Sequence, residues 1–159
     1  MTDESGEQKP LLEGYKRNIL SLVKANLVWQ KDMVFTGSTP QGYEIEFDAN
    51  AQSGCKPTET LLLSLAACMG IDVMSILTKM RMTPVTFRVE IEGERNPTPP
   101  QYYRDIKIVL HLAGKNLDAA KVERAVALSR DKYCSVYNSL RPDMSFSVRW
   151  VLEEKESPA

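Results

Sequence analysis

The chain has 159 residues, of which 43% are apolar and 26% are charged, and its formal net charge is -1. This balance predicts a single globular domain over residues 1–159, with residues 1–20 and 153–159 peripheral to it. The near-neutral charge argues against nucleic-acid and membrane partners.

The first ten residues are polar, without the apolar core of a secretory signal. The longest apolar stretch, residues 61–69, is far shorter than the about 20 residues that a membrane span requires. We therefore expect a cytoplasmic protein.

Apolar and polar residues alternate with a period of two in five segments, which predicts strands with one buried face. These segments are residues 23–29, 43–47, 85–91, 106–112 and 146–152. Turn-forming residues at 37–42 predict a hairpin, so we expect three strand segments before the first helix. Together the patterns predict an antiparallel sheet with one covered face.

The first predicted helix runs from Pro57 to Met80, with Pro57 at its first position and Glu59 in its first turn. Apolar residues lie on nearly every side of it, and a helix that is apolar all round is buried all round. A chain of this length has little material left to cover such a helix, so we predict a homodimer packed over it. Gly70, within this helix, indicates a bend or a close approach.

The second predicted helix runs from Asp118 to Leu140, ends before Pro142, and carries one apolar stripe. Asn116 or Asp118 is its expected N-cap. Two helices laid on an antiparallel sheet give an α+β fold.

The three cysteines, Cys55, Cys68 and Cys134, are too few and too widely spaced for a disulfide framework. Cys68 lies in the middle of the first helix and Cys134 in the second. Each is either a small buried apolar residue or a reactive thiol. A reactive thiol needs a cation nearby. Basic residues neighbour Cys134 in the sequence, whereas the nearest charged residue to Cys68 is Asp72.

Other chemistry finds little support in the sequence. The only histidine is His111, expected to face solvent from a strand, and there is no Cys-x-x-Cys pair, so we expect no metal site. A single histidine and the lack of a Gly-x-Ser-x-Gly elbow also argue against a serine hydrolase. No glycine-rich phosphate loop suggests a bound nucleotide, and we expect no bound cofactor.

Two segments carry a family resemblance. Residues 57–68 (PTETLLLSLAAC) resemble the proline-led, leucine-rich helix of OsmC/Ohr proteins, and residues 128–136 (LSRDKYCSV) resemble the segment around that family's second cysteine. The resemblance spans about residues 23–150. It implies an OsmC-like α+β fold in which two chains interweave as a homodimer, with the central helix buried between them.

The resemblance also implies a function in oxidative-stress defence. Cys68 would be the thiol that attacks a hydroperoxide, and Cys134 the thiol that closes a disulfide on it. An external dithiol of the lipoyl type would then restore both thiols. Apolar helix walls around Cys68 would favour an organic hydroperoxide as the substrate.

The sequence departs from the Ohr branch at two places. Where that branch has a glutamate directly after the proline, this chain has Thr58, and the acid is Glu59. Where it has an arginine that holds the thiolate, the nearest match is Lys31, so Glu59 and Lys31 are weaker site candidates than the cysteines. Cys55 matches no family cysteine and is either incidental or a rival resolving thiol. The alternative functions are a non-catalytic dimer that binds a small apolar or thiol-reactive ligand, and a thiol redox sensor.

Overall fold

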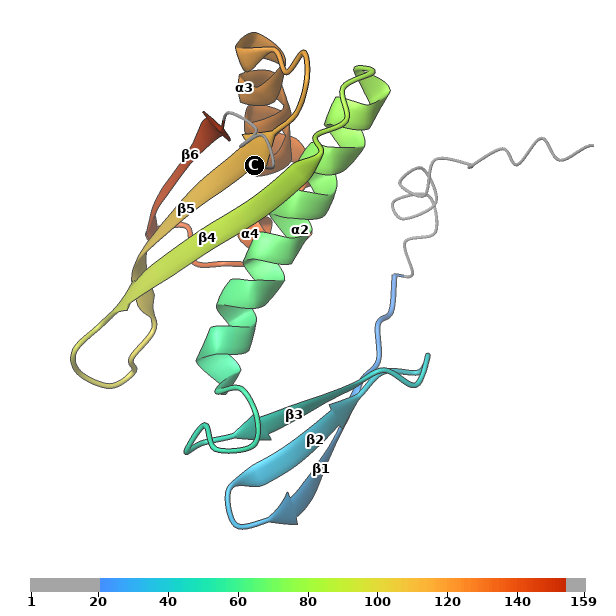
Figure 1. The fold of residues 1–159 in the computed structure, drawn as a ribbon. Coiled ribbons are helices and arrows are strands. Elements are labelled where there is room, and N and C mark those ends of the chain that lie inside the picture. The colour runs from blue at the N-terminus through green and yellow to red at the C-terminus, as the bar shows by residue number, and fades with distance from the viewer. Residues whose placement is uncertain (1–20, 154–159) are drawn as a thin grey trace, which may run out of the picture.

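The computed structural model of the protein describes residues 21–153 and contains two three-stranded sheets connected by a long helix (Figure 1). The first sheet holds β1 (Asn26–Lys31), β2 (Val34–Ser38) and β3 (Glu44–Asp48). The long helix is α2 (Pro57–Lys79), and the second sheet holds β4 (Thr86–Arg95), β5 (Tyr103–Ala113) and β6 (Ser145–Glu153). Between β5 and β6 lie α3 (Ala119–Leu128), the π-helix η1 (Ser129–Tyr133) and α4 (Ser135–Asn138). The α+β class is confirmed.

The first sheet is an antiparallel meander in the order β1-β2-β3. Its second turn confirms the predicted hairpin: the Thr39 amide donates to the Tyr43 carbonyl at 3.0 Å, and Gly42 has a φ of 87°. The first strand begins three residues later than its alternation predicts and runs to Lys31.

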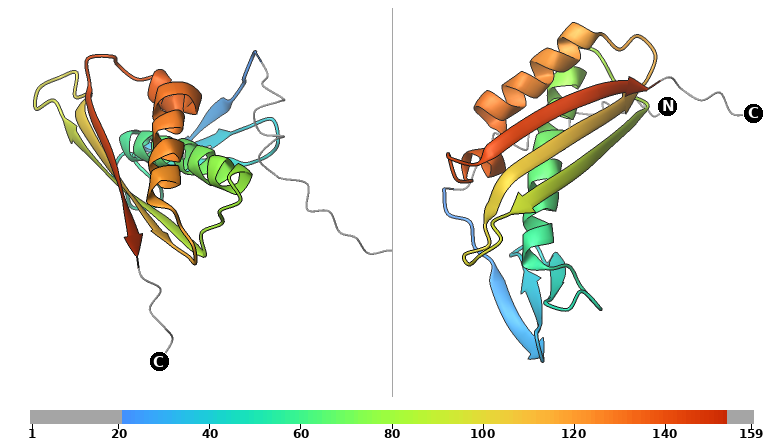
Figure 2. Two further views of the ribbon diagram at one scale, coloured as in Figure 1. Left: turned by 90° about the horizontal axis from the view of Figure 1, so that it is seen from above. Right: turned by 90° about the vertical axis from the view of Figure 1, so that its left-hand side faces the viewer.

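The second sheet corrects the expectation of one wholly antiparallel sheet. β5 is its central strand, antiparallel to β4 but parallel to β6. A parallel neighbour needs a crossover of a dozen or more residues, and α3, η1 and α4 provide it. Figure 2 shows α2 and α3 on the same face of this sheet, while the other face is open.

The core lies between the second sheet and its two covering helices. Four alternate side chains of β5 are at most 1% exposed, as the period of two predicts: Ile106, Ile108, Leu110 and Leu112. The indole N–H of Trp150 on β6 donates to a Glu123 carboxylate oxygen of α3 at 2.7 Å. The rings of Tyr137 on α4 and Phe146 on β6 are 4.4 Å apart, so both ends of the crossover are tied to β6.

Helix α2 follows the sequence prediction closely, and Gly70 within it marks a close approach to β4. A Cβ at Gly70 would lie 3.3 Å from the Phe87 ring. One flank of α2 is buried, yet Leu63 and Ile71 on the other side remain exposed. A single chain therefore covers only part of the helix, and the homodimer remains a prediction.

By length and composition α2 is also long and apolar enough to cross a membrane. This finding corrects the argument from residues 61–69, because the helix built around that stretch has 23 residues. The buried core helix of a water-soluble domain meets the same criterion. Here α2 packs against β4 and α3 and carries the buried Asp72.

The second predicted helix is divided, which corrects the expectation of one helix over residues 118–140. Asp118 is its N-cap, as predicted, and accepts a hydrogen bond from the Lys121 amide at 2.9 Å. The regular helix ends at Leu128, continues as one π-turn, and breaks at Cys134.

The expected peripheral ends mostly lie outside the described residues, as residues 1–20 and 154–159 do. Glu153 does not belong with them: it is the last residue of β6 and pairs with Ala113 of β5.

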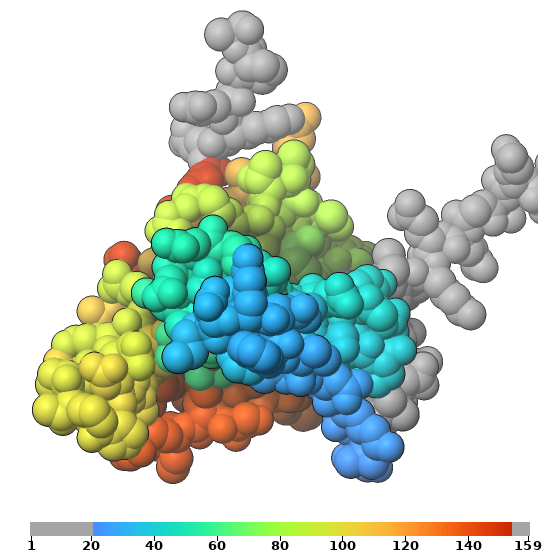
Figure 3. Space-filling model, turned by 90° about the horizontal axis from the view of Figure 1, so that it is seen from below, coloured from blue at the N-terminus to red at the C-terminus, as the bar shows by residue number. Residues whose placement is uncertain are grey.

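The first sheet stands apart from the other described elements, which are α2, the second sheet and the crossover helices. It lies beyond the N-terminal end of α2, and no strand of it packs extensively against the second sheet or the helices (Figure 1). Seen from below in Figure 3, the blue and cyan residues of this sheet project in front of the start of α2. Much of the sheet is therefore exposed in one chain, including Leu27, Trp29 and Ile45.

We predict that Gly93→Ala destabilises the fold. A Cβ at Gly93 would lie 2.5 Å from the ring of Tyr103, whose hydroxyl donates to the Thr58 carbonyl at 2.9 Å. Displacing this ring should lower the free energy of unfolding by about 1–3 kcal/mol, measured by urea denaturation. The neighbouring Glu92→Ala, on the open face, should change it by less than about 0.5 kcal/mol. Equal effects of the two substitutions would contradict the packing role of Gly93.

Candidate functional site

The sulfur atoms of Cys68 and Cys134 come together inside the chain. Cys68 comes from the middle of α2, and Cys134 from the break between η1 and α4. Both sulfurs and a carboxylate oxygen of Asp72 lie within 4.8 Å of one another. All three residues are buried, Cys134 completely. The two cysteines therefore form a buried dithiol with a carboxylate beside it.

The position of Cys134 depends on the irregular turn before it. The Cys134 amide donates to the Ser129 carbonyl at 2.8 Å, which closes the wide turn of η1. Its ψ of 98° then ends the helix, and Cys134 becomes the N-cap of α4, where its sulfur accepts from the Tyr137 amide at 3.4 Å. A single π-turn inside a helical segment is often found at a functional site. Here it fixes the sulfur of Cys134 toward α2.

Asp72 and Ser129 complete the site, and neither was predicted from the sequence to have a role in it. Asp72 lies one turn after Cys68 on α2, so the two side chains share a face of the helix. The Ser129 hydroxyl donates to Asp72 Oδ2 at 3.1 Å, and both side chains are buried. A signal was present, because Asp72 is the only charged residue between Glu59 and Lys79 in this apolar helix.

The surroundings of Cys134 keep its thiol protonated at neutral pH. Burial, the largest cause, raises the pKa of Cys134 from its ordinary 9.0 to about 12. The Tyr137 amide lowers this pKa, whereas Cys68 and Asp72 raise it further. None of these principal influences within the described part of the chain is a cation.

Glu59 does not reach the dithiol within one chain. Its carboxylate accepts a hydrogen bond from the Lys56 amide at 2.9 Å, in the first turn of α2. Cys68 lies nine positions after Glu59, which corresponds to about 13 Å along the axis and to the opposite side of the helix. Glu59 therefore acts as a helix-terminal acid in a single chain.

Lys31 and Cys55 also lie away from the dithiol. Lys31 is the exposed last residue of β1, in the first sheet. Cys55 forms an isolated bridge with Phe47 before the start of α2. From Pro57 to Cys68 alone the helix rises by about 16 Å, so Cys55 cannot close a disulfide with Cys68 of the same chain.

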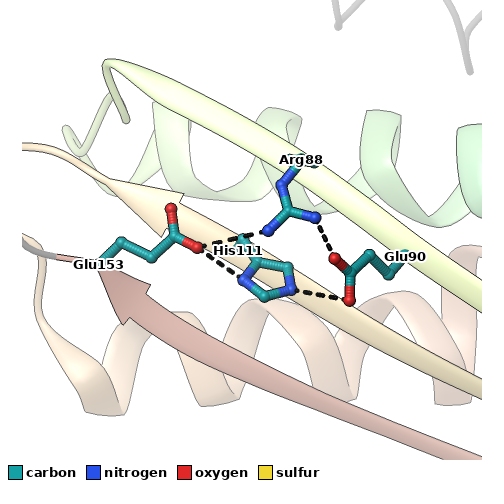
Figure 4. Close-up of polar contacts among 4 residues, drawn as sticks. All are labelled: Arg88, Glu90, His111 and Glu153. Atoms are coloured by element: carbon teal, nitrogen blue, oxygen red, sulfur yellow. Dashed lines mark hydrogen bonds and ion pairs between the residues drawn. The ribbon is translucent and has the colours of Figure 1, made fainter.

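His111 lies on the open face of the second sheet, as predicted, but its ring is only 14% exposed (Figure 4). Its Nδ1 is 2.7 Å from a Glu153 oxygen and its Nε2 is 3.3 Å from a Glu90 oxygen. Hydrogen bonding from Arg88, with a smaller contribution from His111, lowers the pKa of Glu90. The inward residues of β5 alternate with His111, so this cluster lies across the sheet from the dithiol.

We predict that alkaline pH destabilises the reduced protein through Cys134. The folded state holds this thiol neutral up to about pH 12, whereas an exposed thiol ionises near 9.0. The resulting stabilisation is complete below about pH 9 and is lost as the pH rises toward 12. Between pH 7.5 and 10, the free energy of unfolding, measured with urea in metal-free buffer, should therefore fall by about 1.4 kcal/mol more in the parent than in Cys134→Ser. Cys55→Ser should behave as the parent does. An equal fall in all three proteins would contradict the raised pKa of Cys134.

Comparisons with known proteins agree with this architecture. The family model described as OsmC-like protein matches residues 50–149. Protein YhfA of Escherichia coli is 35% identical over 115 residues, which cover 72% of this chain and 86% of that protein.

Two solved structures extend the comparison. A hypothetical protein from Aquifex aeolicus is 30% identical and superposes with a TM-score of 0.78, covering 86% of this chain and all of the other. The organic hydroperoxide resistance protein OhrB of Bacillus subtilis shares the fold, with a TM-score of 0.56 at 14% identity over 82% of this chain and 98% of OhrB. Because the family model matches residues 50–149 and protein YhfA is 35% identical over most of the chain, the chain belongs to the family of OsmC-like proteins.

Proposed function

We propose that this protein is a thiol-based redox enzyme that reduces organic hydroperoxides in cytoplasmic oxidative-stress defence, with Cys68 and Cys134 as its reacting groups. The observation that supports this proposal best is the meeting of the two sulfurs within 4.8 Å, beside Asp72. Disulfide formation requires an S–S distance of about 2.05 Å, so the sulfurs have to approach by less than about 3 Å.

The reaction would proceed in three balanced steps. The Cys68 thiolate attacks one peroxide oxygen and breaks the O–O bond; the alkoxide takes up a proton and leaves as an alcohol, while Cys68 becomes a sulfenic acid. The sulfur of Cys134 then displaces that hydroxyl as water and forms the disulfide. An external dithiol of the lipoyl type reduces the disulfide and is itself oxidised to a cyclic disulfide.

The environments of the two cysteines favour this division of roles. Cys134 is fully buried, and its pKa is raised to about 12, so it is a poor primary nucleophile at neutral pH. Cys68 lies at the border of the exposed side of α2, next to Ala67 and three residues before Ile71. A small hydroperoxide would reach Cys68 first, and the apolar side chains there favour an organic one.

Asp72 would assist the second step. The proton of Cys134 has to leave when its sulfur attacks Cys68, and the Asp72 carboxylate lies within the same 4.8 Å cluster. The Ser129 hydrogen bond fixes the orientation of that carboxylate. We assign Asp72 as the group that accepts the proton of Cys134 and passes it to the hydroxide that leaves the Cys68 sulfenic acid, which then departs as water.

We also propose that two chains form a homodimer over the surfaces that one chain leaves bare. Leu27, Trp29, Phe35, Ile45 and Phe47 lie on one face of the first sheet, because their register places them opposite one another. Several of them line an apolar hollow of about 310 Å³. Leu63, Ala67 and Ile71 form an exposed stripe on α2. A second chain would cover these surfaces. Because Lys31 and Glu59 lie away from the dithiol of their own chain, they could take part in the site only from the second chain.

A second candidate function, a non-catalytic dimer that binds a small apolar or thiol-reactive ligand, also has a specific observation in its favour. Among the described residues, no cation contributes to the principal shifts of the Cys134 pKa, and an apolar hollow is available. Native mass spectrometry of the purified protein separates the two functions. A stoichiometric adduct or ligand without peroxide turnover would favour binding.

We predict that Cys68→Ser abolishes turnover of cumene hydroperoxide with dihydrolipoamide as the reductant, because it removes the attacking sulfur. Cys134→Ser should still oxidise Cys68 in a single turnover but should form no intramolecular disulfide, as peptide mass spectrometry would show. Cys55→Ser is the matched control and should retain full turnover. Equal turnover in Cys68→Ser and the parent would eliminate the proposed reaction.

We predict that Ile45→Lys converts the dimer to single chains, because it places a charge on the apolar face of the first sheet. Thr36→Lys, on the opposite face of the same sheet, should leave the dimer intact. Sedimentation velocity measures both, and a parent protein that sediments as a single chain would refute the dimer.

A further inference from the structure

The cluster of Cys68, Cys134 and Asp72 offers three metal-ligating atoms within 4.8 Å of one another. We propose that the reduced protein binds one thiophilic divalent metal ion, of the zinc type, through these three side chains. This inference does not rest on the proposed peroxide chemistry, although it uses the same thiols.

One histidine and the lack of a Cys-x-x-Cys pair predict no metal site from the sequence. Such patterns, however, reveal only ligands that are close in the sequence. Cys68 and Asp72 are four residues apart on α2, the same spacing at which two helical histidines bind zinc in a His-Glu-x-x-His motif. The third ligand, Cys134, joins them only because η1 turns its backbone toward α2.

The geometry requires little adjustment. Two thiolates on one tetrahedral zinc ion, each at about 2.3 Å, lie roughly 3.8 Å apart, and a carboxylate ligand is bound at about 2.0–2.2 Å. Since all three ligand atoms already lie within 4.8 Å of one another, side-chain movements of about 1 Å would bring them into the coordination sphere.

The electrostatics of the pocket also favour a bound cation. Two thiols and a carboxylate, all groups that become anionic when they lose a proton, are packed against one another in a buried site. A divalent ion would stabilise their anionic forms, because a coordinated thiol loses its proton outright. Two thiolates and a carboxylate around zinc leave a net charge of about -1, far less than three unpaired anions would carry.

Ser129 would hold the metal ligand Asp72 in position. Its hydroxyl donates to Asp72 Oδ2 at 3.1 Å, and such hydrogen bonds to a ligand typically strengthen metal affinity by about 10–100-fold. Three protein ligands would leave one tetrahedral position open, as in sites that bind a water or an exogenous ligand. Disulfide formation would consume two ligands and release the ion.

The test uses the reduced, full-length, metal-stripped protein titrated with Zn²⁺ by calorimetry and with Co²⁺ by absorption spectroscopy. We expect one ion per chain, proton release on binding, and a thiolate-to-cobalt charge-transfer band. Cys68→Ser, Cys134→Ser and Asp72→Asn should each weaken Zn²⁺ binding more than about 10-fold, and Ser129→Ala about 10–100-fold. Asp72→Asn preserves the side-chain shape, and circular dichroism verifies that every variant is folded.

Cys55→Ser and His111→Ala are the matched controls and should bind Zn²⁺ as the parent does. Three results would each overturn the proposal. The first is binding of less than about 0.1 ion per chain, a tenth of what one tetrahedral site would hold, and the second is the lack of a charge-transfer band. The third is Zn²⁺ binding that survives Cys68→Ser but depends on Cys55 or His111. Because no peroxide is present, failure here leaves the proposed enzymatic reaction standing. Lack of turnover in the metal-free protein would remove the reaction and leave the metal site.

Discussion

The packing of one flank of α2 against the second sheet and α3 determines most of what this molecule can do. The helix is apolar around its whole circumference, but a single chain provides a covering layer on one side only. The buried flank brings Cys68 and Asp72 opposite Cys134, and the bare flank borders Cys68. A buried thiol at the border between the packed core and the exposed side of α2 has a fixed geometry and lies close to the surface, and the proposed reaction of Cys68 needs both.

The cluster itself is costly to bury. A carboxylate removed from water costs several kcal/mol unless hydrogen bonds or a counter-charge compensate. Every position next to Asp72 on α2 is apolar or small, and the Ser129 hydroxyl donates a hydrogen bond to its carboxylate. Replacing the acid by an apolar residue would pack as well in a core that served only stability. The cost of burying an acid beside two thiols therefore favours the proton-acceptor and metal-ligand roles proposed for Asp72 over a purely structural one.

Much of the fold could be predicted from the sequence, because periodicity reports directly on burial. The alternation at residues 106–112 identified the most deeply buried strand, and Pro57 marked the start of α2. The division into two sheets left no such mark, because alternation gives the face of a strand but not its partners. The break at Cys134 could not be predicted from the sequence either. No glycine or proline occurs there, and the apolar stripe continues through the π-turn at helical spacing.

Of the residues that form the site, only Cys68 and Cys134 could be predicted from the sequence. Two cysteines at the centres of two helical segments were a visible feature, whereas Asp72 has the wrong charge for the expected stabilising cation and so received no role. Glu59 and Lys31 were named by their positions in the resemblance, but a shift of one residue on a helix rotates a side chain by about 100°. Glu59 therefore binds the start of its own helix instead of facing the dithiol.

The protonation of the thiols connects the two proposals. Burial and Asp72 both oppose ionisation of Cys134, so any reaction of its sulfur requires either a cation or a proton acceptor at the moment of bond formation. A lysine from a second chain would lower the cost of the thiolate and leave the sulfur lone pairs available to attack. A metal ion would lower it further but would bind one sulfur lone pair and draw electron density from the sulfur. The metal-bound form would therefore react more slowly with peroxide than the metal-free thiolate, and the disulfide form could not bind the ion until it is reduced.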